Sequence, residues 1–166
     1  MVLALTALVV YGSMIAEALV AARNDRALRA TGAVEPRGDV YRVMQIAYPA
    51  CFAAMLGEGA LRNVMPDTAF AAGAAIFAAA KLLKYWAIAS LGARWTFRVL
   101  VPPGSVRTRR GPYRWLAHPN YIGVAGELIG AAAAMHAIVS GPIAVAGFCV
   151  LMLRRVLVEE KALAGE

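Results

Sequence analysis

The sequence predicts an all-α integral membrane protein with about five transmembrane helices. Of its 166 residues, 61% are hydrophobic and only 16% are charged, whereas a soluble domain is nearer half apolar with about a quarter of its residues charged. The apolar residues gather in long runs, several of which reach the roughly 20 residues that cross a bilayer. Because these runs are apolar on every side rather than along one stripe, we expect them to lie in a membrane.

Five runs are the predicted spans, and the last two are expected to form a C-terminal helical hairpin around the turn at Ser140–Pro142. A bend is expected in the second run at Pro49. No basic segment precedes the first run, so we expect a span rather than a cleaved signal peptide. Four crossings are the alternative, if the first or the last run is only partly inserted. The predicted spans are residues 1–22, 40–60, 67–91, 121–138 and 143–158.

The spans belong to one predicted domain, residues 1–166. Its parts are three N-terminal spans in residues 1–91, a cytoplasmic connector in residues 92–120, and the hairpin with a C-terminal motif in residues 121–166. Polar and ionisable side chains concentrate in the second and third parts. Because ionisable groups beside a membrane core are costly, this concentration indicates a functional, ligand-binding segment on the cytoplasmic side.

The basic residues, which give the chain a net charge of +7, alternate between the two sides of the predicted membrane. Cytoplasmic loops carry the excess of Lys and Arg in membrane proteins, so the N-terminus is expected outside and the C-terminus in the cytoplasm. The same distribution argues against nucleic-acid binding. The predicted cytoplasmic side holds Arg23, Arg26, Arg29, Arg37, Arg42, Lys81, Lys84, Arg94, Arg98, Arg107, Arg109, Arg110, Arg114, Arg154, Arg155 and Lys161, and the other side holds Arg62.

A first polar motif precedes the fourth span. Pro119 suits the first turn of a helix, which places the next residues at a helix N-terminus that favours an anionic group. His118 stands directly before it, Tyr121 follows one turn on, and Gly123 leaves space for a close approach. This setting predicts ligand contacts, with an ordinary interfacial histidine as the alternative for His118.

A second polar motif follows the fifth span. The adjacent carboxylates of Glu159 and Glu160 repel each other and are more stable with a cationic partner, such as an ammonium or sulfonium ligand. The alternative is a solvated helix end in which Arg155 pairs with Glu159 four residues on. Inside the spans, Glu17 and Glu127 are intramembrane carboxylates, so each is a functional candidate, with a protonated or arginine-paired structural role as the alternative.

Several site classes have no support in the sequence. There is no CxxC, no His/Cys cluster and no HExxH pattern, so a metal site is not expected. There is no GxGxxG after a strand and no P-loop, so a Rossmann-type or phosphate-cradling nucleotide site is not indicated.

The two motifs together resemble the isoprenylcysteine carboxyl methyltransferase family, in its bacterial integral-membrane branch. One departure is Ala117, where the family usually has an arginine directly before the His-Pro pair, so one ligand contact is either missing or supplied by Arg114. The resemblance is carried by Gly111–Arg114, His118, Pro119, Tyr121, Gly123, Arg155–Glu160 and Leu163, with further matches at Gly92–Thr96, Arg23–Asn24 and Gly32–Glu35.

The resemblance implies S-adenosylmethionine as methyl donor, bound at the cytoplasmic face by the last two spans. It assigns the cofactor to His118, Pro119, Tyr121, Gly123, Glu159 and Glu160, the two glutamates lying near its amino group. Arg155 would lie near the reacting methyl group and orient an anionic acceptor. If the acceptor is a phenol, a general base is needed, and Glu127 or His118 is the candidate.

The expected acceptor is a lipophilic small molecule that enters sideways from the membrane lipid and is methylated on oxygen. The resemblance suggests an alkylpyrone, an alkylphenol or an isoprenylcysteine-like carboxylate. Alanine-rich usage and a preference for arginine over lysine favour a bacterial cytoplasmic membrane. The alternatives are N-methylation of a phospholipid amine, and a non-catalytic membrane scaffold or transporter.

Overall fold

The computed structural model describes residues 1–36, 38–100, 102 and 108–164, with side chains up to Lys161. Arg37 and Arg107, which belong to the predicted cytoplasmic charges, and the side chain of Leu163 lie outside the described residues. The described elements are all helical. They are α1 (Val2–Ala30), α2 (Tyr41–Leu61), α3 (Thr68–Leu91), η1 (Gly92–Arg94), η2 (Gly111–Arg114), α4 (Pro119–Ala134) and α5 (Ser140–Ala164).

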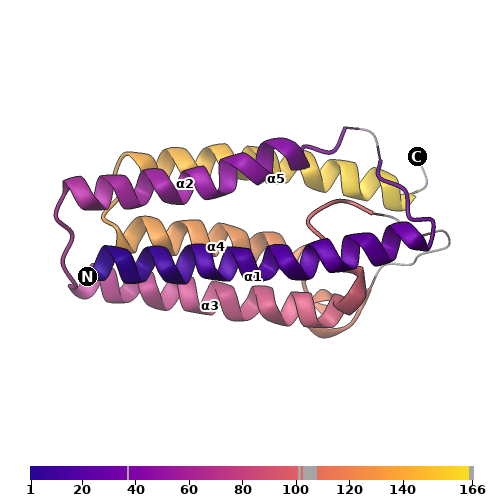
Figure 1. Cartoon of the computed structure of the whole chain (residues 1–166), viewed down its shortest axis with the longest axis horizontal. Helices are drawn as coiled ribbons and strands as arrows, with labels where there is room; N and C mark the ends of the chain where they lie inside the picture. Colours follow the sequence, from indigo (N-terminus) through magenta and orange to yellow (C-terminus); the bar gives the residue numbers. More distant parts are fainter. Residues whose placement is uncertain (37, 101, 103–107, 165–166) are drawn as a thin grey trace.

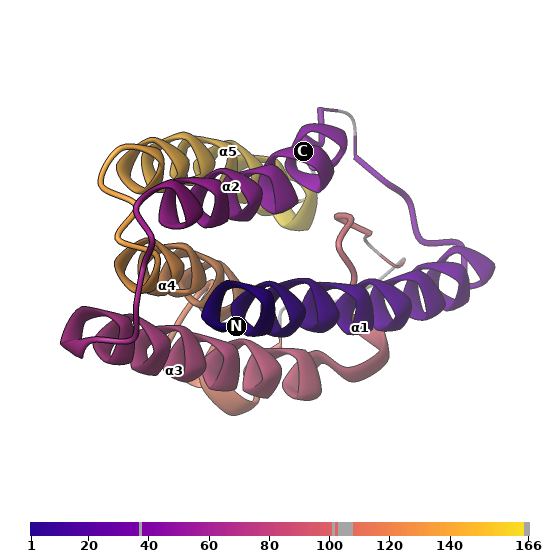
Figure 2. The ribbon, with the colours of Figure 1, turned by 60° about the vertical axis from the view of Figure 1, so that its left-hand side comes forward.

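The five α-helices run along the long axis of the molecule, with the N- and C-termini at opposite ends (Figure 1). Figure 2 shows α2 beside α5, with α4 between this pair and α3. Contacts agree with the picture, since α4 packs against α3, α5 and α2, while α1 contacts α2 and η1. The predicted all-α fold and the C-terminal hairpin of α4 and α5 are therefore confirmed.

Among the described residues, three helices are long and apolar enough to cross a membrane by length and composition, namely α1, α3 with η1, and α5. Helix α4 has 16 residues, so it extends only about 24 Å at 1.5 Å per residue, less than the roughly 30 Å hydrocarbon layer. The five crossings predicted from sequence thus correspond to five helices, of which three meet the criteria for a span.

Three predicted boundaries differ from the structure. The hairpin turn was expected at Ser140–Pro142, before a span at residues 143–158, but α5 already begins at Ser140 and residues 135–139 make the turn. The fourth span was expected to reach Ile138, but α4 ends at Ala134 and His136 turns the chain with a positive φ of 48°. The first span was expected to end at Ala22, but α1 continues to Ala30. This helical extension carries Arg23 to Arg29 beyond the apolar run, because charged residues with good helix propensity prolong a helix without needing lipid.

Close packing of small residues joins α3 to α4. A Cβ atom at Gly73 would lie 2.3 Å from the backbone N of Ala134, and one at Gly130 would lie 2.5 Å from the backbone N of Phe77. Such contacts let two helix backbones approach closely, as expected in a membrane where apolar burial gives little driving force. The α3–α4 contact is therefore the most extensive helix–helix contact of the bundle.

The core lies between α2, α4 and α5, and the outer surface is apolar. Phe52, Met55, Leu128 and Met135 are almost fully buried. Large apolar side chains are exposed along the outer faces of the helices, which suits a lipid environment rather than water. These exposed residues include Leu5, Leu8, Ile15, Leu19, Ile46, Leu82, Ile143, Leu153 and Leu157.

Candidate active site

The two polar motifs of the sequence meet at one end of the helix bundle. His118 is the N-cap residue of α4, and Pro119 is its first helical residue, so the backbone N–H groups of Tyr121 and Ile122 both reach the His118 carbonyl. Pro119 itself is buried and does not line the pocket. Its fixed φ starts the helix and holds His118 and Tyr121 on the side that faces α5.

Helix α5 supplies the facing side chains. His118 Nε2 lies 2.8 Å from Glu160 Oε1, and its Nδ1 lies 3.8 Å from Glu159 Oε2. The ring of His118 stacks on the ring of Tyr121 with centroids 5.5 Å apart. Five of the predicted site residues, His118, Tyr121, Arg155, Glu159 and Glu160, are therefore brought together.

The Tyr121 hydroxyl lies between the cation and the anion of this group. It accepts a hydrogen bond from Arg155 Nε at 3.0 Å and donates one to Glu159 Oε2 at 3.0 Å. The sequence alternative, a solvated helix end with Arg155 and Glu159 paired directly, is thus replaced by a bridged arrangement. Arg155 is buried, with only 5% of its surface exposed. Its charge therefore interacts with groups inside the site and hardly with solvent.

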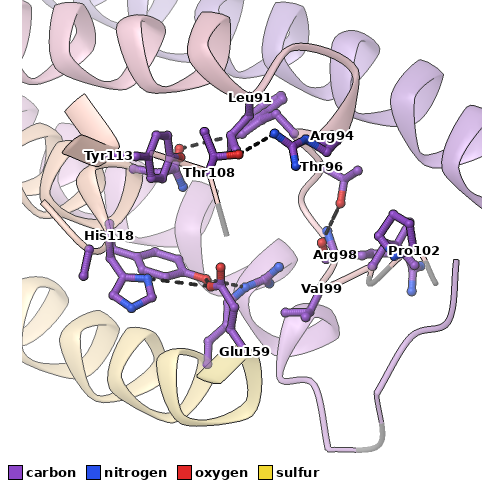
Figure 3. A pocket seen from close by; sticks show the side chains of 16 residues that line it. Leu91, Arg94, Thr96, Arg98, Val99, Pro102, Thr108, Tyr113, His118 and Glu159 are labelled. Atoms are coloured by element: carbon purple, nitrogen blue, oxygen red, sulfur yellow. Dashed lines mark hydrogen bonds and ion pairs between the residues drawn. The ribbon is translucent and has the colours of Figure 1, made fainter. Parts of the chain in front are cut away.

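A pocket opens between this group and the connector that follows α3. Figure 3 shows His118 and Glu159 on one wall, with Arg94 and Thr108 on the wall across from them. Arg94 donates to the Thr108 hydroxyl. The lining residues are Leu91, Arg94, Trp95, Thr96, Arg98, Val99, Leu100, Pro102, Thr108, Tyr113, Ala117, His118, Asn120, Tyr121, Arg155 and Glu159.

The connector is fixed to α1 and α4 by buried hydrogen bonds. Asn24 of α1 donates through Nδ2 to the carbonyls of Gly92 (3.2 Å) and Trp95 (2.8 Å). Trp95 Nε1 donates to Asn120 Oδ1 at 3.3 Å, and the indole is almost completely buried. The extension of α1 therefore shapes the pocket wall, although the sequence suggested only a loop there.

Tyr113 lines the pocket outside the membrane-spanning helices. Its burial, with a smaller contribution from the negative charge of Glu159, raises the pKa of its hydroxyl well above the ordinary value of 10.0. Tyr113 therefore stays a neutral phenol at physiological pH and can donate a hydrogen bond to a ligand.

Gly123 was predicted to contact the cofactor, but it faces α3 instead. A Cβ atom at this position would lie 2.9 Å from Lys84 Cβ and 3.2 Å from the Ala80 carbonyl oxygen. Gly123 does not line the pocket. The small residue at this position lets α4 pack closely on α3. A sequence motif alone does not distinguish this use of glycine from a close approach to a ligand.

The missing arginine at Ala117 is not replaced by Arg114. Arg114 is exposed and lies 5.7 Å over the ring of Trp115, away from the pocket lining. Arg94 and Arg98 line the pocket instead. These two arginines, which line the pocket together with Ala117, belong to the predicted cytoplasmic connector.

Glu127, the second predicted catalytic residue, lies in a different place from the pocket. It forms a buried cluster with Glu17, Lys81 and Lys84, in which each lysine Nζ lies 2.6–3.2 Å from an oxygen of both carboxylates. Tyr48 donates to Glu127 Oε2 at 2.5 Å. Glu127 is therefore ion-paired, but its partners are two lysines and not the arginine that the structural alternative expected.

Lys81 and Lys84 were predicted to be cytoplasmic boundary charges, and that placement is wrong. Both are buried, because they lie three residues apart on the α3 face that meets Glu17 and Glu127. The signal that could have located them is the presence of two carboxylates inside apolar runs. Two matching cations inside the membrane are the least costly way to neutralise such carboxylates.

Comparison with known proteins identifies the class. Residues 73–165 match the isoprenylcysteine carboxyl methyltransferase (ICMT) family, and this segment contains every pocket-lining residue. The chain belongs to this family, whose members are membrane methyltransferases that generally use S-adenosylmethionine.

Two curated relatives carry no assigned function. The chain is 33% identical to the uncharacterized protein YpbQ of Bacillus subtilis over 69% of this chain and 68% of that protein. It is 24% identical to an uncharacterized protein of Haemophilus influenzae over 86% of this chain and 83% of that protein. No solved structure matches the chain.

Proposed function

We propose that the pocket binds S-adenosylmethionine and that the protein methylates an oxygen atom of a lipophilic small molecule at the cytoplasmic membrane face. The observation that carries this proposal is the bridged group of His118, Tyr121, Arg155, Glu159 and Glu160 at the pocket. Its side chains fit the cofactor, since the carboxylates suit an ammonium and the aromatic rings suit a purine, while Arg155 is available for an anionic acceptor.

The balance of charge in the pocket supports an anionic acceptor. Arg94, Arg98 and Arg155 line it, against the single carboxylate of Glu159 among the described lining residues. Glu35 and Asp39, which do not line the pocket, pair with Arg98 and Arg155. The charged side chains of the lining itself are mainly guanidinium donors, which favour a carboxylate or an acidic enol over the amine of a phospholipid. The lining therefore favours the O-methylation that we propose over the N-methylation alternative.

The residues act mainly by alignment. When bound, the cofactor supplies a methyl group on a positively charged sulfur, which an oxygen nucleophile takes by in-line displacement. Arg155 would hold the anionic oxygen in line, and the apolar bundle would exclude water. A carboxylate or enolate needs no base. For a phenol, His118 is the candidate base, because it lines the pocket while Glu127 is ion-paired elsewhere.

We also propose that the chain crosses the membrane with its N-terminus outside and its C-terminus in the cytoplasm of a bacterial cell. After Lys81 and Lys84 are removed from the count, arginines still predominate at the pocket end and Arg62 stands at the other end. The lipophilic acceptor would then reach the pocket from the surrounding lipid.

The decisive experiment is calorimetric binding of S-adenosylhomocysteine to detergent-purified protein, with the Glu159→Ala/Glu160→Ala double variant and Lys161→Ala as a matched control. Loss of two charge-assisted contacts is expected to weaken binding at least about 30-fold in the double variant. Lys161 is an exposed cation at the same helix end, and its variant should bind like the wild type. If folded wild-type protein does not bind S-adenosylhomocysteine, the non-catalytic scaffold or transporter becomes the favoured alternative.

A further inference from the structure

The charge of Arg155 has a buried partner outside the segment that defines the family. Asp39, in the loop between α1 and α2, lies with its Oδ1 3.6 Å from Arg155 Nη1. The two side chains are only 4% and 7% exposed. Removing one partner of such a buried pair leaves an uncompensated charge, so Asp39 and Arg155 depend on each other.

Backbone N–H groups fix the Asp39 carboxylate. Its Oδ1 accepts from the Tyr41 N–H at 3.1 Å, at the start of α2. Its Oδ2 accepts from the Val99 N–H at 3.2 Å, in the connector that lines the pocket. A single carboxylate therefore ties together α2, the pocket wall and α5, and its position is set by main-chain atoms rather than by flexible side chains.

The guanidinium of Arg155 is held on several sides. Nε donates to the Tyr121 hydroxyl, Nη2 donates to the Phe97 carbonyl, and Nη1 lies 3.9 Å from the Met44 sulfur. Within the described part of the chain, Asp39 is the carboxylate that pairs with it directly. Asp39 does not line the pocket, whereas Arg155 and Val99 both do. The carboxylate therefore acts on the site through its contacts with these two lining residues.

We propose that Asp39 is a positioning residue for methyl transfer, which holds the Arg155 guanidinium in the orientation that meets the acceptor. This inference rests on the proposed function. Without the Asp39 charge, the guanidinium would be drawn through Tyr121 toward Glu159, the carboxylate to which the Tyr121 hydroxyl donates. A displacement of about 1 Å at an aligning group can lower a rate about 100-fold.

The test compares Asp39→Asn with Glu35→Gln, which removes another carboxylate of the same loop that bonds to Arg29 and Arg98 rather than to Arg155. The first readout needs no cofactor. In protein labelled with ¹⁵N-arginine, the Arg155 Nε–H resonance is assigned by its loss in Arg155→Lys. Asp39→Asn should shift or broaden this resonance, and Glu35→Gln should leave it in place.

The second readout is the single-turnover rate of tritiated methyl transfer to a farnesylcysteine carboxylate or a long-chain 4-hydroxy-2-pyrone, whichever the wild type accepts. For Asp39→Asn we expect the rate to fall at least about tenfold while the Kd of S-adenosylhomocysteine stays within about threefold. If Asp39→Asn does not fold, Asp39→Glu keeps the charge but displaces it, and the same resonance shift and rate loss are expected.

Three results would overturn the inference. An Asp39→Asn protein with an unchanged Arg155 resonance and an unchanged rate would show that the pair does no positioning. Equal resonance shifts in Asp39→Asn and Glu35→Gln would assign the effect to the loop as a whole. If the wild type neither binds S-adenosylhomocysteine nor transfers a methyl group, the proposed function itself is wrong. Because this result is obtained with the wild type alone, it is distinguished from a failure of the Asp39 inference.

Discussion

Lys84 Nζ of α3 lies 2.6 Å from Glu17 Oε2 of α1, and both side chains are almost completely buried. Helix α1 buries few residues against the rest of the bundle, namely Val10, Glu17, Ala21, Asn24 and Leu28. Its attachment to α3 and α4 therefore depends on long side chains that carry charge, rather than on the close backbone packing that joins α3 to α4.

The buried cluster predicts a large effect of single substitutions. In Lys84→Met, the carboxylates of Glu17 and Glu127 share one ammonium, and we expect a loss of about 3–5 kcal/mol in the free energy of unfolding. Denaturation of the detergent-solubilised protein by sodium dodecyl sulfate measures this loss. Adding Glu17→Gln restores charge balance and should recover part of it. A double variant no more stable than Lys84→Met would contradict the charge-balance explanation, and Arg62→Met serves as the exposed control.

The close contact between α3 and α4 predicts that adding a single methyl group there lowers the stability of the protein. In Gly130→Ala, the new Cβ would lie 2.5 Å from the backbone N of Phe77, and the helices must separate at a cost of about 1–3 kcal/mol. Gly147→Ala is the control, because no atom lies within 4 Å of its added Cβ. Thermal unfolding followed by circular dichroism compares the two variants. Equal melting temperatures would mean that this contact is not close in the protein.

The hydroxyl of Tyr121 predicts a functional loss without a loss of packing. Tyr121→Phe removes the bridge between Arg155 and Glu159 but keeps the ring that stacks on His118. Two lost hydrogen bonds to charged groups should lower kcat/KM about 10- to 100-fold. Tyr11→Phe removes a hydroxyl that bonds to the Pro49 carbonyl away from the pocket and is the matched control. Similar kinetics for both variants would argue against a role of the bridge.

The Glu35 carboxylate predicts a pH dependence of stability. Partial burial raises the pKa of Glu35, but hydrogen bonds from Arg29 and Arg98 outweigh it and lower the pKa below the ordinary 4.5. Its stabilising contribution is therefore present above pH 4.5 and is lost as the pH falls through the folded-state pKa. The melting temperature of the wild type should exceed that of Glu35→Gln at pH 7, and the difference should vanish in acid. A difference that stays constant down to pH 3 would contradict the assignment.

The proposed membrane orientation predicts which end of the helix bundle a thiol reagent can reach from outside the cell. In a chain that carries Cys51→Ala and Cys149→Ala, Ile138→Cys places a thiol at an exposed position in the turn between α4 and α5. Thr31→Cys places one after α1, at the pocket end. A membrane-impermeant maleimide should label Ile138→Cys in intact cells and Thr31→Cys only after permeabilisation. The opposite labelling pattern would reverse the topology.

The sequence by itself determined the helical elements and the two motifs that meet at the pocket. Runs of apolar residues require helices in a membrane, because the backbone must satisfy its own hydrogen bonds there. Pro119 suits the first turn of a helix and an apolar run follows it, so His118 and Tyr121 could be placed at a helix N-terminus. The helical spacing of Arg155 and Glu159 likewise sets both on one face of α5. These conclusions need only local rules.

The tertiary structure decided which side chains face each other across helices. Lys81 and Lys84 look like boundary charges in the sequence, and only the approach of α1 and α4 to the same face of α3 shows that they neutralise Glu17 and Glu127. Gly123 fits a ligand-binding motif equally well until α3 is found against it. Asp39 gives no sequence signal as a partner of Arg155, because 116 positions separate them and the loop path alone brings them together.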